Sequence, residues 1–335
     1  MRKLVIGSRV SKEQEGIRVY EFDEASGRLT YLTGINGIEM PTFQCVDQKQ
    51  HILYSVCETE QDGHIYAYQL TEDAPPRFLF TLPSLGGSPC HLSLDPSKER
   101  LAVANYANGV FTQLGLGRSF GLHYSESFSG TGENPVRQQG SHIHSSLWMK
   151  DGSSLFVADL GLDTIVWYDK SLQTRQLIKT PPATGPRHMV LSPDEQLLYI
   201  VAELSSETLI YRLGTNPTLV QRISTVSDSF SGENTAADLH FSNDYRFLYC
   251  SNRGYDSIVV YAVEPQTGVL TVAGFIPTLQ EPRNFAISPS SSFLLVANGS
   301  SDRVTVHALD QRTGLAGAAI QTLEVEQPVC LTFVE

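Results

Sequence analysis

Cationic and proton-carrying side chains recur at two positions of a repeated sequence unit. The first position precedes one short apolar run, and the second follows the next apolar run of the same unit. The clearest copy places Arg187 and His188 at the start and Glu203 at the end, and later copies add Arg253 and Arg283. Arginine binds carboxylate or phosphate with two parallel hydrogen bonds, and histidine and glutamate exchange protons near neutral pH when their surroundings tune them. This combination predicts an anion site capable of proton transfer.

The two positions can be followed along the whole chain. The first position holds Thr42, Cys90, His144, Arg187, Ala237, Arg283 and Val329, and the residues directly after these are Phe43, His91, Ser145, His188, Asp238, Asn284 and Cys330. The second position holds Arg9, Glu58, Tyr106, Leu160, Glu203, Arg253 and Gly299. Positions that needed only solubility would carry interchangeable small polar residues. Cations gather at these positions instead, in a chain of net charge −12. This predicts that the repeated units bring them together around a single anion site at one opening of the folded chain.

Each charged candidate also has a structural interpretation. Arg187 and Arg283 could fasten neighbouring units through ion pairs, and Arg253 could be a solvated surface residue. Glu203 could serve only as the ion-pair partner of Arg187. The sequence alone leaves these alternatives open.

The histidines allow more than one role. His142 and His144 alternate across one residue, so on a strand they share a face. Such a pair also occurs in metal sites, but no third ligand stands at a fitting spacing, and no metal is expected. His188 is expected to point away from Arg187, with a packed role and a catalytic one equally open, and His91 shares its position and its ambiguity.

The elements that position these residues are short strands. Apolar runs rich in Val, Ile, Leu and Tyr are separated by turns with Pro, Gly, Asp and Asn, as in strands rather than helices. The residues that close the first run of each unit are 43 to 54 residues apart, and they are Asp47, Asp95, Met149, Ser192, Ser242 and Ser288. This period is typical of β-propeller blades with four antiparallel strands.

The two ends of the chain complete the count. Residues 3–20 resemble only the later strands of a unit, and residues 327–334 resemble only its first strand. Six whole units and these two fragments predict an all-β, seven-bladed propeller with residues 1–335 in one domain, whose ring is closed by a blade shared between the termini. The stretch 115–139, which contains Arg118 and Arg137, breaks the period and is expected to be a long loop beside the opening.

Composition excludes several classes of protein. Hydrophobic residues make up 41% of the chain and charged residues 18%, enough for a packed core. The acidic balance and the lack of a basic run argue against nucleic acid. No apolar run is long enough for a signal peptide or a membrane span, so a cytoplasmic protein without a membrane partner is expected. The five cysteines lack a CxxC pair and are expected to be reduced thiols.

Several motifs resemble one known family. They are Ala104-Asn105-Tyr106, Gly185-Pro186-Arg187-His188-Met189, Ala202-Glu203-Leu204, Ser251-Asn252-Arg253-Gly254 and Pro282-Arg283-Asn284-Phe285. At matching blade positions over the full chain, they are similar to the lactonase family of seven-bladed propellers. That family includes propeller-type 6-phosphogluconolactonases and fungal carboxy-muconate cyclases.

The resemblance implies roles for individual residues. It implies a catalytic set of His144, Arg187, Glu203 and Arg253, with His142 competing for the place of His144 because Ser141 stands where the family often has proline. The residues expected to bind substrate are Arg283, His188, His142, His91, Tyr106 and Asn252.

The leading functional hypothesis is hydrolysis of an anionic sugar lactone, with 6-phosphogluconolactone as the expected substrate. His144 or Glu203 would activate water, and Arg187 or Arg253 would stabilise the oxyanion. The sequence has no Gly-x-Ser-x-Gly elbow and no nucleotide-binding glycine motif, so no cofactor is expected. One alternative is a muconate cyclase-like isomerase that forms a lactone at the same site. Another is a binding propeller without catalysis; in each case the chain is expected to be a monomer or a weak oligomer.

Overall fold

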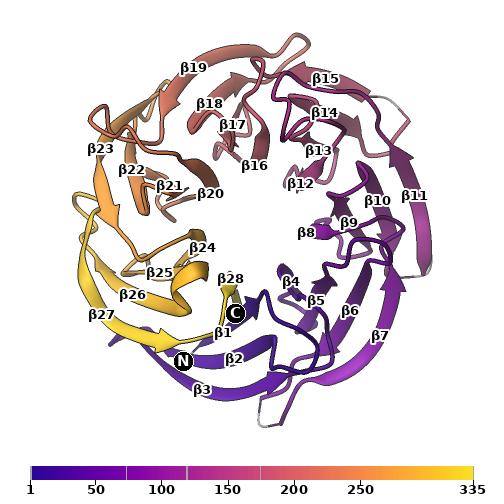
Figure 1. Cartoon of the computed structure of the whole chain (residues 1–335), viewed down its shortest axis with the longest axis vertical. Helices are drawn as coiled ribbons and strands as arrows, with labels where there is room; N and C mark the ends of the chain where they lie inside the picture. The colour runs from indigo at the N-terminus through magenta and orange to yellow at the C-terminus, as the bar shows by residue number, and fades with distance from the viewer. Residues whose placement is uncertain (1, 73, 118–119, 174, 335) are drawn as a thin grey trace.

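The chain forms a ring of seven four-stranded antiparallel sheets around a central channel (Figure 1). The structure is a computed structural model that describes residues 2–72, 74–117, 120–173 and 175–334. This arrangement confirms the predicted all-β propeller and its count of blades. The described residues include no helix with the length and hydrophobicity needed to traverse a lipid bilayer.

In every blade the first strand lies at the channel and the fourth at the rim. From the channel outward, the shared blade contains β28 (Pro328–Val334), β1 (Arg2–Ser8), β2 (Ile17–Asp23) and β3 (Arg28–Ile35). The next three blades contain β4 (Gln44–Asp47), β5 (Ile52–Cys57), β6 (His64–Gln69) and β7 (Arg77–Pro83); β8 (Pro89–Leu94), β9 (Arg100–Asn105), β10 (Val110–Gly115) and β11 (Gly121–Ser127); and β12 (Ile143–Trp148), β13 (Ser154–Asp159), β14 (Thr164–Asp169) and β15 (Arg175–Lys179). The last three contain β16 (Pro186–Leu191), β17 (Leu197–Ala202), β18 (Glu207–Arg212) and β19 (Thr218–Ser224); β20 (Thr235–Phe241), β21 (Phe247–Arg253), β22 (Ser257–Val263) and β23 (Leu270–Pro277); and β24 (Pro282–Ile287), β25 (Phe293–Asn298), the short 3₁₀ helix η1 (Gly299–Ser301), β26 (Arg303–Leu309) and β27 (Ala316–Glu324).

The ring is closed by pairing between the two ends of the chain. In the shared blade, β1 pairs with β28, and Leu4 lies opposite Phe333. The N-terminal share of this blade is larger than the predicted 3–20, because β3 extends it to Ile35. Few residues of β3 are buried, and its apolar residues do not alternate regularly. The sequence pattern therefore did not indicate that this strand belongs to the N-terminal fragment.

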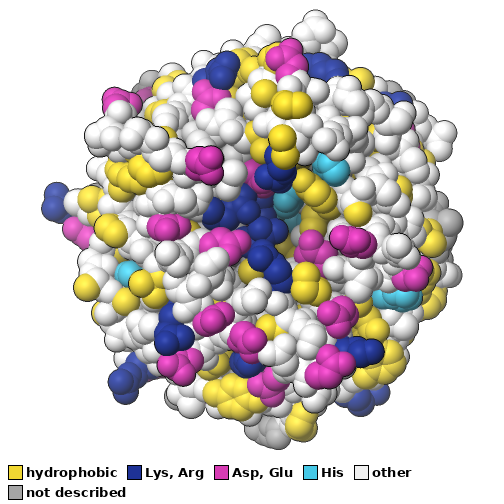
Figure 2. Space-filling view, in the orientation of Figure 1, with side chains coloured by type: hydrophobic (Ala, Val, Ile, Leu, Met, Phe, Trp, Pro, Cys, Tyr) yellow, Lys and Arg dark blue, Asp and Glu magenta, His cyan; other side chains and the backbone are white. Residues whose placement is uncertain are grey.

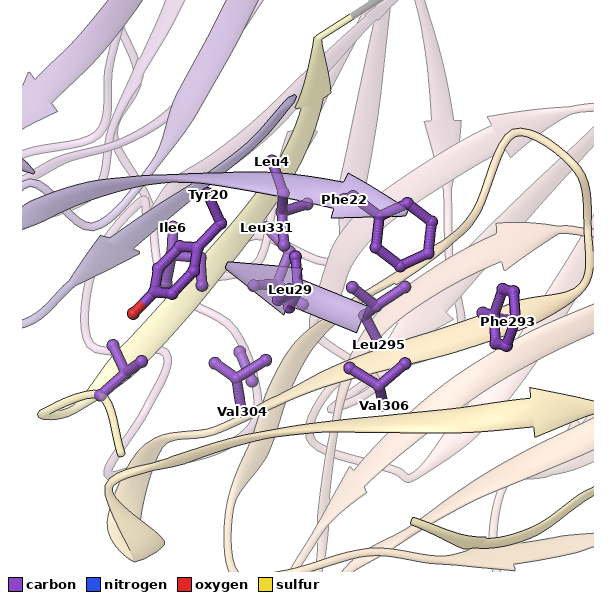
Figure 3. Packing of buried hydrophobic residues seen from close by; sticks show 12 residues of the cluster. Leu4, Ile6, Tyr20, Phe22, Leu29, Phe293, Leu295, Val304, Val306 and Leu331 are labelled. Carbon is purple, nitrogen blue, oxygen red and sulfur yellow. The ribbon is translucent and has the colours of Figure 1, made fainter. Parts of the chain in front are cut away.

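The core lies between the blades rather than inside a single one. Each of seven buried apolar clusters draws its side chains from two neighbouring blades. Figure 3 shows the cluster between the shared blade and the last one, where Phe22 meets Phe293 edge to face with ring centroids 5.8 Å apart. Burial of this apolar surface on both sides of every blade stabilises the ring without a separate hub.

One expected loop is partly a strand. The stretch 115–139 contains β11, the outer strand of its blade, and only the residues after Ser127 form the excursion toward the channel. Arg118 lies outside the described residues. The five cysteines are free thiols, four of them buried and Cys45 partly exposed.

The inner strands share a bulge that decides where the candidate side chains point. Single residues are skipped in the pairing of β8, β12, β16 and β24, and these are Cys90, His144, Arg187 and Arg283. In β20 the pairing skips two residues, Ala237 and Asp238. A bulge leaves the extra residue unpaired and redirects its side chain. In these blades the first repeated position of the sequence is therefore the bulge of the inner strand, whereas Thr42 lies before β4, whose pairing with β5 is regular.

Candidate active site at the mouth of the channel

Glu203 is a buried carboxylate surrounded by three arginines. It follows β17, and its backbone N–H donates to the carbonyl of Gly185 at 2.8 Å. Its Oε2 lies 3.0 Å from Nε of Arg187 and 3.1 Å from Nη2 of Arg253, and its Oε1 lies 2.7 Å from Nη2 of Arg137. The side chain of Glu203 is only 3% exposed. Four segments distant in sequence thus converge on one carboxylate.

The electrostatics of this cluster fix its charges. Burial alone would raise the pKa of Glu203, but Arg253, Arg187 and Arg137 outweigh it and lower that pKa to about 2. Burial, together with Arg253 and Arg283, lowers the pKa of Arg187 to about 9. At neutral pH, Glu203 is therefore ionised, and Arg187 is protonated although burial and the neighbouring arginines destabilise its charge.

Arg187 has further contacts. Its Nη1 donates to the carbonyl oxygen of Ala237 at 2.5 Å and lies 3.2 Å from Nε2 of His188. The expectation that His188 points away from Arg187 is therefore wrong, because the bulge at Arg187 breaks the two-residue alternation on which that expectation relied.

His188 is held by a buried carboxylate. Its Nδ1 lies 2.7 Å from Oδ1 of Asp238, and Oδ2 of Asp238 lies 2.8 Å from Nε2 of His240 and accepts from Nδ2 of Asn284. Burial and Arg187 lower the pKa of His188 to about 4, so its ring is neutral at physiological pH. A neutral ring that donates Nδ1–H to Asp238 leaves Nε2 as an acceptor toward Arg187.

The predicted histidine pair surrounds Tyr106. The ring of His142 stacks on Tyr106 at 4.3 Å between centroids, and His144 meets it edge to face at 5.5 Å. The hydroxyl of Tyr106 accepts from Nη2 of Arg137 at 3.2 Å. Nε2 of His144 lies 3.9 Å from Glu203, and burial, with Arg187, holds the pKa of His144 well below its ordinary value. His144 therefore lies deeper in the site than His142, which remains partly exposed.

A second cluster of charges occupies the other side of the mouth. Glu281 lies 3.6 Å from Nη2 of Arg9 and 4.0 Å from Nη1 of Arg283. These two arginine side chains are 30% and 21% exposed. Their distances to Glu281 are longer than the distance from Arg187 to Glu203, and their side chains are more exposed than that of Arg187. They can therefore bind a ligand in addition to Glu281.

A small hollow at the mouth is lined by Arg187 of the first cluster and Arg283 of the second. It is lined by Thr42, Phe43, Glu58, Cys90, Arg187, His188, Arg283, Asn284 and Val329. Figure 2 shows dark-blue Lys or Arg side chains gathered inside the central opening with histidine beside them. The converging positive charge that the sequence predicted is therefore present in the geometry.

Glu58 faces this hollow, and its contacts and pKa differ from those of Glu203. Its Oε2 accepts a hydrogen bond from Oγ1 of Thr42, and it forms no ion pair with any described residue. Burial raises the pKa of Glu58 above its ordinary value, and the opposing effects of Thr42, Arg283 and Arg9 do not cancel this rise.

Not all the predicted residues lie at the hollow. Asn252 is fully buried, and its Nδ2 donates to Thr225 and Ser257 within its own blade and the one before it. His91 packs against Phe43 with centroids 4.3 Å apart and against His188 at 5.3 Å, behind the hollow. His91 therefore supports His188 from behind the hollow, whereas the Asn252 side chain bonds to residues outside it.

The sequence prediction missed several charged residues. Arg137 comes from the excursion before β12, outside the repeat, so no repeated position indicated its role. Glu58 and Arg9 occupy the second repeated position, which was the signal that could have found them. Asp238, next to the first position, is the buried partner of two histidines.

Comparison with known proteins agrees with the seven-bladed fold. A family model described as "Lactonase, 7-bladed beta-propeller" matches residues 3–333. The chain is 34% identical to a 6-phosphogluconolactonase of Formosa agariphila over 333 residues, which cover 93% of each chain. It is 28% identical to a 6-phosphogluconolactonase of Bacillus subtilis over 98% of this chain and 97% of that protein.

Solved structures agree as well. A periplasmic gluconolactonase of Pseudomonas aeruginosa superposes with a TM-score of 0.92 at 30% identity, covering 100% of this chain and 99% of that one. A protein of Bacteroides fragilis described as a putative 6-phosphogluconolactonase superposes with a TM-score of 0.91 at 26% identity, covering 100% and 98%.

Proposed function

Because this chain belongs to the lactonase family of seven-bladed β-propellers, we propose that it hydrolyses a phosphorylated sugar lactone, with 6-phosphogluconolactone as the substrate. The curated relatives named 6-phosphogluconolactonase support the reaction class. The charges at the channel mouth support the choice of an anionic substrate.

The observation that carries the proposal is the excess of arginine over paired carboxylate. Three arginines surround Glu203 and two share Glu281 among the described residues, in the order Arg137, Arg187, Arg253, Arg9 and Arg283. This positive excess lies in a chain whose net charge is −12. A cleft of one sign concentrates a ligand of the opposite sign.

The two clusters suit the two ends of the substrate. Arg187 and Arg253 lie deep, where both contact Glu203, and Arg187 also lines the hollow. In the proposed reaction these guanidinium groups stabilise the negative charge that forms on the lactone carbonyl oxygen. Arg9 and Arg283 are more exposed and take the phosphate, which arginine binds through two parallel hydrogen bonds.

Glu203 acts in this scheme by holding its arginines in place. Its pKa of about 2 makes it a poor proton acceptor at neutral pH. His144 stays neutral beside it and contributes shape and polarity rather than charge.

The test is hydrolysis by the purified protein, corrected for the spontaneous opening of the lactone. We expect catalysis of 6-phosphogluconolactone, a kcat/KM about 100-fold or more lower for the unphosphorylated lactone (a loss of roughly 3 kcal/mol), and no lactone formation from carboxy-muconate. An equal rate with both lactones would refute the phosphate assignment. Conversion of the muconate alone would favour the isomerase hypothesis, and no turnover of any of them would favour a binding propeller.

A further inference from the structure

Glu58 and Glu203 occupy the same place in two different blades. Each is the residue after the second strand, and each backbone N–H donates to the carbonyl of the residue two places before the first repeated position of its own blade, to Met40 at 3.1 Å and to Gly185 at 2.8 Å. The two blades are three places apart in a ring of seven (Figure 1). The repeat therefore delivers two carboxylates to nearly opposite sides of one mouth.

The surroundings of the two carboxylates differ. Three guanidinium groups contact Glu203 within 3.1 Å, whereas the carboxylate of Glu58 accepts a hydrogen bond from the uncharged hydroxyl of Thr42. Two carboxyl groups in one site whose environments favour opposite protonation states are characteristic of an acid–base assignment.

Glu58 also has the access that Glu203 lacks. It lines the hollow together with Arg187 and Arg283, and its side chain is partly exposed while that of Glu203 is buried. The hollow that Glu58 shares with Arg187 and Arg283 measures about 10 Å³, which is about the room that one water molecule needs.

We propose that Glu58 is the general base that activates the hydrolytic water, an assignment that rests on the lactonase function proposed above. The geometric grounds are its place in the hollow, its repeat-related position opposite Glu203 and its freedom from ion pairing with the described residues. The environment that raises its pKa fits the same role, because a carboxylate nearer neutrality is a stronger base.

The proposed step balances in protons and electrons. The ionised carboxylate of Glu58 takes a proton from water while the water oxygen forms a bond to the lactone carbonyl carbon. The carbonyl oxygen becomes an oxyanion that Arg187 and Arg253 stabilise. When this intermediate collapses, the bond from the carbonyl carbon to the ring oxygen breaks, and the ring oxygen takes the proton from Glu58. The product is the open hydroxy acid, which loses its own proton to solvent.

The other proton carriers near the hollow are less suited to this step. Nδ1 of His188 is engaged with Asp238, and its Nε2 faces Arg187. Burial raises the pKa of the Cys90 thiol, so little thiolate is present at neutral pH. Among the described residues that line the hollow, Glu58 is the carboxylate.

The decisive experiment compares Glu58→Gln with Glu60→Gln, a matched change at an exposed glutamate two residues away. Wild type and both variants are assayed with 6-phosphogluconolactone across pH, and binding of the product 6-phosphogluconate is measured by calorimetry. For Glu58→Gln we expect kcat to fall about 100-fold or more and the acidic limb of the pH profile to disappear. Product affinity should stay within about threefold, since the change removes a transition-state interaction. Glu60→Gln should behave as wild type.

Two outcomes overturn the assignment in distinguishable ways. If wild type hydrolyses the lactone but Glu58→Gln keeps more than about half of its kcat with the same acidic limb, Glu58 is not the base while the lactonase function stands. If wild type itself does not exceed the spontaneous rate, the proposed function fails and the role of Glu58 fails with it. Glu58→Asp guards against misfolding, because it keeps a carboxylate and should retain the acidic limb at reduced kcat.

Discussion

Nε of Arg187 lies 3.0 Å from Oε2 of Glu203, and both side chains are almost excluded from water, at 4% and 3% exposure. This pair links the bulge of one inner strand to the end of the neighbouring strand in the same blade. Breaking a buried ion pair by removing one partner leaves an uncompensated charge and costs about 3–5 kcal/mol. The pair therefore bears on both stability and activity.

Glu203→Gln should lower the free energy of unfolding, because three arginines lose their shared anion. We expect a loss of about 3–5 kcal/mol, measured by denaturant unfolding at pH 7. Glu326→Gln, on an exposed glutamate, is the control and should leave the unfolding free energy unchanged.

The same pair predicts a pH dependence of stability. The pKa of Glu203 is about 2 in the folded protein against an ordinary value of 4.5. A carboxylate with a lowered folded pKa stabilises the fold fully above its unfolded pKa, and this contribution is lost as pH falls from about 4.5 toward 2. Wild type should therefore lose stability over this window more steeply than Glu203→Gln. Parallel curves for the two proteins would contradict the lowered pKa.

Arg187→Lys should impair catalysis although it keeps the positive charge. One ammonium cannot contact Glu203, the Ala237 carbonyl and His188 at once as the guanidinium does. We expect kcat to fall about 100- to 1,000-fold, as when an oxyanion donor is lost, with a smaller change in KM. Steady-state kinetics with the phosphorylated lactone would measure this, and an unchanged kcat would remove Arg187 from the oxyanion site.

Arg283→Gln should separate substrate binding from chemistry. Its guanidinium is 4.0 Å from Glu281, loose enough to bind a phosphate. For the phosphorylated lactone we expect KM to rise about tenfold or more, as when one charged contact is lost, with little effect on the unphosphorylated lactone. Arg303→Gln, at a surface pair with Glu324, is the control. An equal effect on both lactones would place the phosphate elsewhere.

Thr42→Val should move the acidic limb of the pH–rate profile. The hydroxyl of Thr42 donates to the carboxylate of Glu58 and lowers its pKa. Without this bond the pKa of Glu58 rises further, so the base is protonated at higher pH and the limb shifts upward. The rate on the plateau should stay within about twofold, because the base itself remains. A limb that does not move would show that it reports another group.

The sequence predicted the positions of those site residues that belong to the repeated unit. Because each blade uses the same turn and strand pattern, the positions of Arg187, Glu203 and Arg253 followed from spacing, and the structure brings all three together. The orientation of His188 did not follow, because a bulge adds a residue without leaving a mark in the apolar alternation. The stretch that contains Arg137 was expected beside the opening, but the contact of Arg137 with Glu203 could not be foreseen, because this segment has no counterpart in the other blades.

The joined ends of the chain have a consequence for how the site forms during synthesis. Arg9 follows β1, and Val329 belongs to β28, yet these strands pair only after the ribosome has released nearly every residue between them. Such a distant pairing carries a large loop-closure entropy and forms late. The anion-binding hollow is therefore completed only after β28 has been synthesised, and a nascent chain that lacks this strand holds most of the arginines but not the closed mouth.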